Sequence, residues 1–124
     1  MVETDPATAM KALIRAALVT AMRAKETLKV AALRTVLAAL DNAESVPVGT
    51  QHQRYETHEF GDPRTEVPRR ILTADEVQAL VRSEITKRLD ASVQMDLLGQ
   101  VPQADRLRQE ALALQALDQG SSIT

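Results

Sequence analysis

Thr73 to Gly99 reads TADEVQALVRSEITKRLDASVQMDLLG, and this stretch decides the fold. Thr73 precedes Glu76 by three residues, the spacing of a capping box at the start of a helix. No proline or glycine follows until Gly99, which is placed to end the helix in the left-handed conformation. One helix over residues 74–98 is therefore predicted, roughly 37 Å long. Its apolar face consists of positions that recur at helical spacing: Val77, Leu80, Val81, Ile85 and Leu89.

Three further helices flank this one. Asp5 is a predicted N-cap with Pro6 as the first helical residue, and Thr27 is a predicted cap for the next helix. Pro102 is predicted at the first position of a last helix, and Gly120 at its end. The predicted helices cover residues 6–24, 28–43, 74–98 and 102–118, with Met10, Leu13, Ile14, Leu33, Val36, Leu37, Leu40 and Leu114 among their apolar positions.

Composition agrees with an all-helical chain of one domain, residues 1–124. Alanine and leucine dominate, and Tyr55 and Phe60 are the only aromatic residues, which argues against a sandwich or barrel. We predict an all-α fold, a four-helix bundle-like pair of antiparallel helical hairpins. One long loop, residues 45–72, is inserted between the hairpins. Its residues 45–67 include few apolar side chains, which predicts a small contribution to the core.

The cellular setting is predicted from what the sequence lacks. Without cysteine the chain has no disulfide, no thiolate zinc site and no thiol nucleophile. Residues 1–6 carry two acids and no apolar run, unlike a signal peptide, and no stretch approaches 18 uninterrupted apolar residues. We expect a cytoplasmic protein that does not enter membranes.

Positive charge is concentrated in the first half of the chain. Residues 9–40 hold six basic residues and only Glu26 as an acid, a net charge of +5. This region could face an anionic partner such as RNA, although a solvated helix surface is the simpler interpretation. Aromatic residues that stack on bases are scarce, so weak tRNA binding at most is expected. The basic residues are Lys11, Arg15, Arg23, Lys25, Lys29 and Arg34.

No catalytic constellation or cofactor motif is evident. His52 and His58 lie six residues apart, too far along a strand to share one metal ion. Only a tight irregular loop could bring both to one ion, helped by Glu56 or Glu59, so no metal site is expected. Glu84 and Arg88 have the spacing of a helix-surface ion pair, and Glu84 lies close enough to the apolar stripe to be partly buried. We therefore predict no catalytic residue and no cofactor.

Three blocks of sequence carry a family resemblance. The first comprises Ala21–Lys25, Leu33–Arg34 and Leu40–Glu44. The second comprises Leu72–Val77, Glu84 and Lys87–Asp90; the third comprises Leu98–Gly99, Ala104–Leu107 and Glu110. In order and spacing they resemble the helical amino-terminal domain of the GatB/YqeY family. The segment that closes the loop, Glu66–Arg70, is similar to that of short actinobacterial-type members, but the loop is longer than the link in many relatives. The candidate binding residues are Lys11, Arg15, Arg23, Lys25, Lys29, Arg34, Asn42, Glu44, Glu84 and Arg88.

The resemblance implies an association with tRNA-dependent amidation, in which glutamine is the nitrogen donor of the full amidotransferase. Full-length relatives continue into a second helical domain implicated in tRNA contact, and this sequence stops before it, which again predicts weak tRNA binding. We expect a non-catalytic accessory module with a protein partner. The alternatives are a general protein-interaction module that forms a homo-oligomer, and a carbon–nitrogen ligase with glutamine as amido-N-donor.

Overall fold

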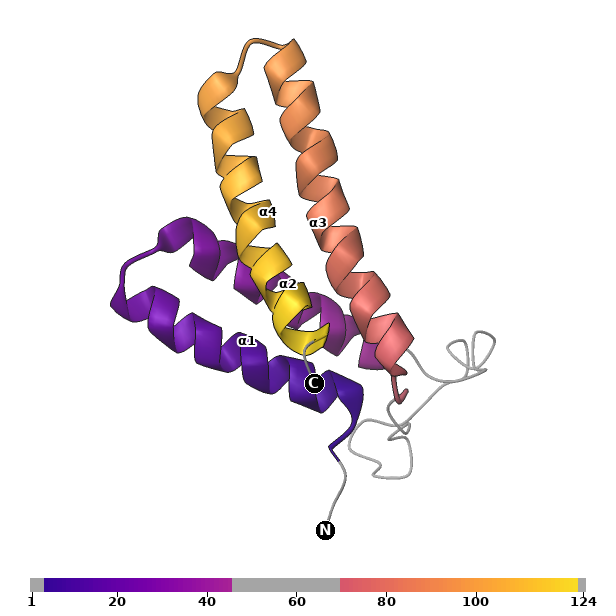
Figure 1. Cartoon of the computed structure of the whole chain (residues 1–124). Coiled ribbons are helices and arrows are strands. Elements are labelled where there is room, and N and C mark those ends of the chain that lie inside the picture. The colour runs from indigo at the N-terminus through magenta and orange to yellow at the C-terminus, as the bar shows by residue number, and fades with distance from the viewer. Residues whose placement is uncertain (1–3, 46–69, 123–124) are drawn as a thin grey trace, which may run out of the picture.

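A computed structural model describes residues 4–45 and 70–122. Within these ranges every regular element is a helix, and the helices form two antiparallel hairpins (Figure 1). The predicted all-α bundle-like fold is confirmed. The four helices are α1 (Pro6–Arg23), α2 (Thr27–Ser45), α3 (Ala74–Leu97) and α4 (Val101–Ser122). None of them is long and apolar enough to cross a bilayer.

Two of the three predicted polar caps, Asp5 and Thr73, are confirmed. The Asp5 side chain accepts a hydrogen bond from the Thr8 amide at 2.9 Å, and Pro6 is the first residue of α1. At α3 the capping box is complete: the Glu76 amide donates to Thr73 Oγ1, and the Thr73 amide donates to the Glu76 carboxylate. These bonds satisfy amide groups that have no partner inside the helix.

The two hairpin turns have the same backbone design but different residues. Gly99 has φ +75°, and the Gln100 and Gly99 amides donate to Met95 O and Asp96 O, a Schellman motif. The α1–α2 turn repeats this motif with Lys25 at the left-handed position, φ +58°. The sequence predicted a break between the two helices but not its left-handed conformation, because a lysine occupies the position usually taken by glycine.

Helix ends differ from the prediction at several positions. α2 begins at Thr27, the residue predicted to cap it, and ends at Ser45, which was predicted to lie in the loop. α4 begins one residue before Pro102 and continues through Gly120 to Ser122. A glycine inside a helix costs only about 1 kcal/mol, so Gly120 does not end α4.

The core lies where the two hairpins meet, and Ile14, Leu33, Leu40 and Leu114 are its largest fully buried side chains. Two predicted core positions are wrong: Leu13 is 42% exposed and Leu89 is 38% exposed. Leu89 lies about 120° around the helix from the buried Val77, which turns it away from the core. The buried apolar residues are Ala7, Met10, Ile14, Ala21, Ala32, Leu33, Val36, Leu40, Leu72, Val77, Val81, Ile85, Ala104, Ala111, Leu114 and Leu117.

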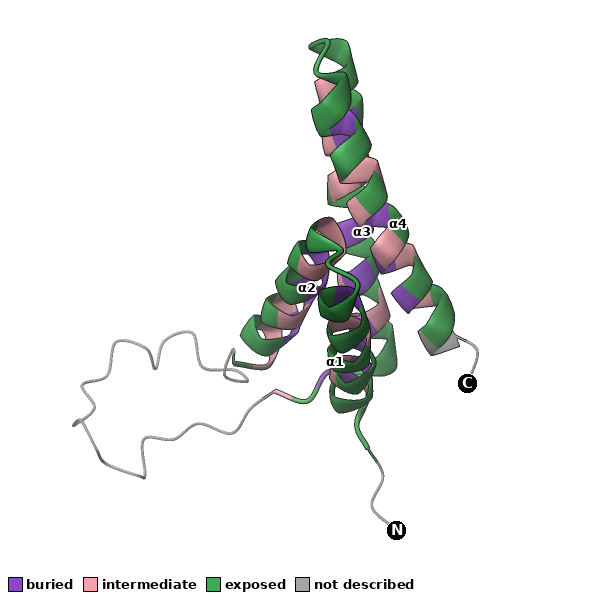
Figure 2. Ribbon diagram, turned by 90° about the vertical axis from the view of Figure 1, so that its left-hand side faces the viewer, coloured by how far each residue is buried: buried purple, intermediate pink, exposed green. Residues whose placement is uncertain are grey.

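The α3–α4 hairpin is much longer than the layer that covers it. The α1–α2 pair lies across its lower half, and the upper half projects alone (Figures 1 and 2). Buried residues concentrate in the lower half and are few above it (Figure 2). The projecting part is therefore held together by contacts between two helices only.

Most of the predicted loop, residues 46–69 with both histidines, lies outside the described residues. Its two flanks meet, because the Arg70 amide donates to Glu44 O at 2.9 Å. Leu72, which was assigned to the loop, is 2% exposed and belongs to the core. The prediction of a small contribution to the core concerned residues 45–67, and nearly all of that range lies outside the described residues.

Candidate functional site

The ten predicted binding residues do not form one site. Nine of them fall into three groups: an ion-paired cluster between α1 and α2, an ion-paired cluster inside the α3–α4 hairpin, and a group of cations on α1, on α2 and in the turn between them. Only the last group is available to a charged partner.

Lys11 and Glu44 belong to the first cluster. Lys11 Nζ lies 2.6 Å from Asp41 Oδ1 and also forms an ion pair with Glu44. Burial disfavours the charged amine, but hydrogen bonds to Asp41 and Glu44 outweigh it and raise the pKa of Lys11. The cluster joins α1 to α2, so Lys11 and Glu44 stabilise the hairpin. Asn42 is exposed beside them.

Glu84 and Arg88 belong to the second cluster. Arg88 Nη1 donates to Glu84 Oε1 at 2.9 Å, and Arg88 Nε donates to Glu110 Oε1 at 2.9 Å. Burial opposes ionisation of Glu84, but hydrogen bonds from Arg88 and Lys87 prevail and lower its pKa. The predicted pair exists and Glu84 is buried as expected, yet the pair lies between two helices and not on the surface. Glu110, its third member, entered the sequence analysis only through the family resemblance.

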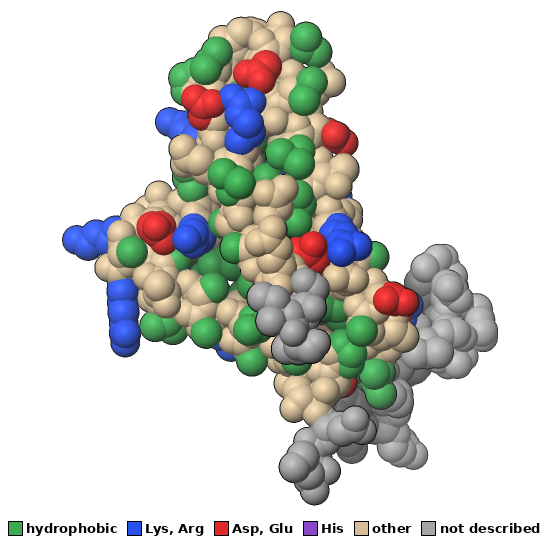
Figure 3. Space-filling model, in the orientation of Figure 1, with side chains coloured by type: hydrophobic (Ala, Val, Ile, Leu, Met, Phe, Trp, Pro, Cys, Tyr) green, Lys and Arg blue, Asp and Glu red, His purple; other side chains and the backbone are tan. Residues whose placement is uncertain are grey.

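The remaining cations lie on α1, on α2 and in the turn between them. Lys29 lies 3.3 Å from Glu26, whereas Arg15, Arg23, Lys25 and Arg34 form no ion pair with another described residue. Blue side chains project around this turn in the space-filling view (Figure 3). Lys25 and Arg34 line a shallow cleft of about 550 Å³ whose other lining residues are Met22, Thr27, Val30 and Ala31.

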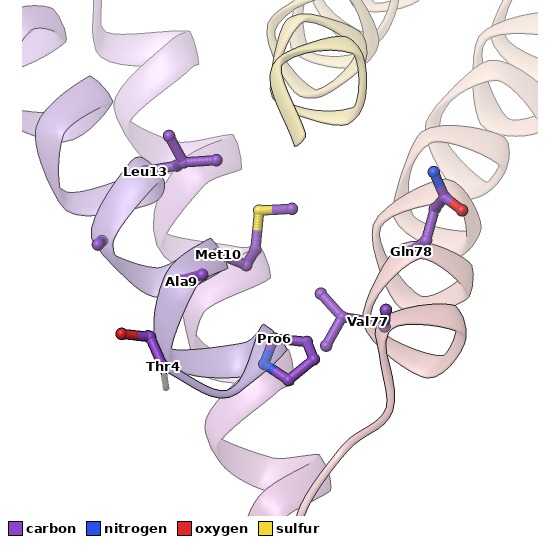
Figure 4. Close-up of a pocket in the computed structure, with 9 residues that line it drawn as sticks. Thr4, Pro6, Ala9, Met10, Leu13, Val77 and Gln78 are labelled. Carbon is purple, nitrogen blue, oxygen red and sulfur yellow. The ribbon is translucent and has the colours of Figure 1, made fainter. Parts of the chain in front are cut away.

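A second hollow, of about 620 Å³, lies where the first turns of α1 and α3 meet. Pro6, Met10 and Val77 lie close together between the two helices (Figure 4). None of its lining residues has a titratable side chain. The lining residues are Thr4, Pro6, Ala9, Met10, Ala12, Leu13, Ala74, Val77 and Gln78. It can therefore hold an apolar group but offers no acid or base. Among the described residues no group of His, Asp and Glu could hold a metal ion.

Exposed apolar side chains gather on the projecting half of the hairpin, and they escaped the sequence analysis. We call Val93, Leu97, Leu98 and Val101 the hairpin tip; their exposed fractions are 54%, 76%, 68% and 53%. They come from the end of α3, the turn and the start of α4, and green side chains are visible around the upper end of the hairpin (Figure 3). The sequence did contain a signal, since these four aliphatic residues lie within a stretch of nine residues around the turn at Gly99.

Comparisons of the chain with protein-family models, with curated proteins and with solved structures each find no match. The GatB/YqeY resemblance therefore depends on the sequence blocks that carry it, and the candidate surfaces depend on their own geometry.

Proposed function

We propose that this chain is a non-catalytic interaction module that binds a protein partner through the hairpin tip. The observation that carries the proposal is the exposure of Val93, Leu97, Leu98 and Val101 on a hairpin that projects beyond its own core. Single exposed apolar residues are ordinary on protein surfaces, but four of them at one projecting end are typical of an interaction site.

The hairpin tip is braced for this role. Arg108 on α4 forms ion pairs with Asp96 on α3, at 2.8 Å, and with Asp105, at 2.5 Å. The Schellman turn adds two backbone bonds between the last turn of α3 and the turn residues Gly99 and Gln100. A surface that is ordered before binding loses less conformational entropy when a partner docks on it.

The family resemblance supports a partner from the machinery of tRNA-dependent amidation or translation. Direct tRNA contact is a weaker expectation, because Lys11 is already neutralised by Asp41 and Glu44 and no described residue is aromatic. The proposed partner is therefore a protein.

The test compares two substitutions of matched exposure. Leu97 and Ile71 are each 76% exposed, but only Leu97 belongs to the hairpin tip. Tagged chains carrying Leu97→Glu or Ile71→Glu are used to capture partners from extract of the source cells, and the captured proteins are identified by mass spectrometry. We expect amidotransferase or translation proteins with the unaltered chain and with Ile71→Glu, and their loss with Leu97→Glu. Equal capture by both variants would refute the role of the tip.

Self-association is the second candidate, favoured by the same exposed residues. Light scattering after size exclusion would then show a dimer that Leu97→Glu dissociates and Ile71→Glu leaves intact. The ligase alternative has no structural observation in its favour. It predicts sustained glutamine hydrolysis by the purified chain that a single substitution abolishes.

A further inference from the structure

The cleft at the α1–α2 turn combines positive charge with an apolar floor. Met22 on α1 is 53% exposed, and Val30 and Ala31 on α2 form the opposite side of the cleft. Lys25 and Arg34 border it. We propose that this cleft binds an acidic amphipathic helix of a partner protein, a site separate from the hairpin tip.

The positive charge around the cleft favours a negatively charged partner. Residues 12–40 hold five basic residues against Glu26 alone. Four of these cations have no ion pair with another described residue, and the fifth, Lys29, makes only an exposed pair at 3.3 Å. An acidic segment would therefore meet cations that need not first break an internal ion pair.

The apolar floor favours a protein over other anionic partners. Proteins that bind single-stranded RNA use aromatic side chains to stack bases, and the described residues include none. A membrane surface would require a larger apolar face than Met22 and the neighbouring Val19, which is 48% exposed. Methionine adapts its shape to the side chains of a bound helix, and amphipathic helices dock in apolar grooves of this kind.

The turn holds one of the cations in place. Lys25 has a left-handed backbone; its amide donates to Met22 O and the Glu26 amide donates to Ala21 O, which restrains the backbone of Lys25 beside the cleft. Arg34 stands two helical turns along α2 from Thr27 and lines the same cleft. The two charges are therefore available to opposite parts of a helix lying in the cleft.

The probe is a fluorescein-labelled peptide of about 18 residues, with leucines at helical spacing on one face and glutamates on the others. Its binding to the full chain is measured by fluorescence anisotropy. We expect a Kd below about 100 µM, and we expect this Kd to increase as the salt concentration rises. We also expect amide shifts in the NMR spectrum to concentrate in residues 19–34.

Charge reversals locate the site. Lys25→Glu with Arg34→Glu should weaken binding at least about tenfold, and Met22→Gln should weaken it severalfold. The matched control is Arg106→Glu, since Arg106 is exposed on α4 and forms no ion pair with another described residue. It should leave the affinity unchanged. Circular dichroism confirms that each variant is folded.

Several results would overturn the proposal. One is equal binding of a peptide with the same composition in scrambled order. Another is unchanged affinity in the Lys25→Glu, Arg34→Glu variant, and a third is no measurable binding of the amphipathic peptide. Tighter binding of a uridine-rich RNA or of phosphatidylglycerol vesicles to the same residues would assign the cleft to that partner instead.

Discussion

Arg88 is the side chain whose loss should be most informative about stability. It joins Glu84 on its own helix to Glu110 on α4 through two contacts of 2.9 Å, and it also donates to Glu84 O at 3.0 Å. The side chains of Arg88, Glu84 and Glu110 are 11%, 11% and 20% exposed. Replacing Arg88 with methionine keeps much of the volume but leaves two poorly solvated carboxylates close together.

The size of the effect follows from burial. Removing one partner of a fully buried ion pair costs about 3–5 kcal/mol. Glu84 keeps its contact of 3.3 Å with Lys87, and Glu110 is partly solvated, so the full penalty does not apply. We expect Arg88→Met to lower the free energy of unfolding by about 2–4 kcal/mol.

Urea unfolding followed by circular dichroism near neutral pH measures this loss. Arg106→Met is the control and should change stability by no more than about 0.5 kcal/mol, because Arg106 is exposed and forms no ion pair with another described residue. Replacing Glu84 and Glu110 with leucine in the Arg88→Met background should restore most of the loss, since no charge is left unpaired. A loss below about 1 kcal/mol in the single variant would refute this reasoning.

The other predictions concern the core, the turns and acid stability. Leu114→Ala should lower the free energy of unfolding in urea by about 2–5 kcal/mol, because Leu114 is fully buried. Leu80→Ala should lower it less, because Leu80 is only partly buried, and equal losses would contradict the core described above. Gly99→Ala should lower the free energy of unfolding by about 1 kcal/mol through backbone strain alone, since a Cβ at position 99 meets no atom within 4 Å. Lys25→Gly should raise the free energy of unfolding, because it relieves the same strain. If the two substitutions shift the thermal unfolding midpoint in the same direction, the left-handed turns are contradicted. The pKa of Glu84 is lower in the folded than in the unfolded state, so its contribution to stability is complete above the ordinary carboxyl pKa and disappears as pH falls through the folded value. Glu84→Gln should therefore be less stable than the unaltered chain near neutral pH and converge with it in acid, and urea midpoints that stay parallel across the acid range would contradict this.

Local sequence determined the helices, and their predicted ends agree with the structure to within one residue except at the carboxyl ends of α2 and α4. Asp5, Thr73 and Gly99 act through bonds to neighbours only a few residues away, so their roles are legible from spacing alone. Lys25 shows the limit of this approach. The turn at Lys25 has the same pattern of backbone hydrogen bonds as the turn at Gly99, but a lysine does not indicate a left-handed conformation as a glycine does.

The candidate site depended on contacts that span the fold. The sequence grouped Lys11 with the other cations by proximity along the chain, but packing of α1 on α2 brought Asp41 and Glu44 to it and removed its charge from the surface. The same packing left Arg34 without an ion pair among the described residues.

Sequence by itself therefore determined the all-α class, the two hairpins and the spacing that buries residues such as Ile14 and Leu114, because these follow from helical periodicity and local caps. Only the tertiary structure decided which charged residues neutralise one another and how far α1 and α2 extend along the α3–α4 hairpin. That extent leaves the upper half of α3 with α4 as its neighbour, and Val93 and Leu97 near the end of α3 are exposed. The physical reason is that burial and ion pairing depend on which helix lies opposite, and the apolar spacing along one helix does not indicate which helix that is.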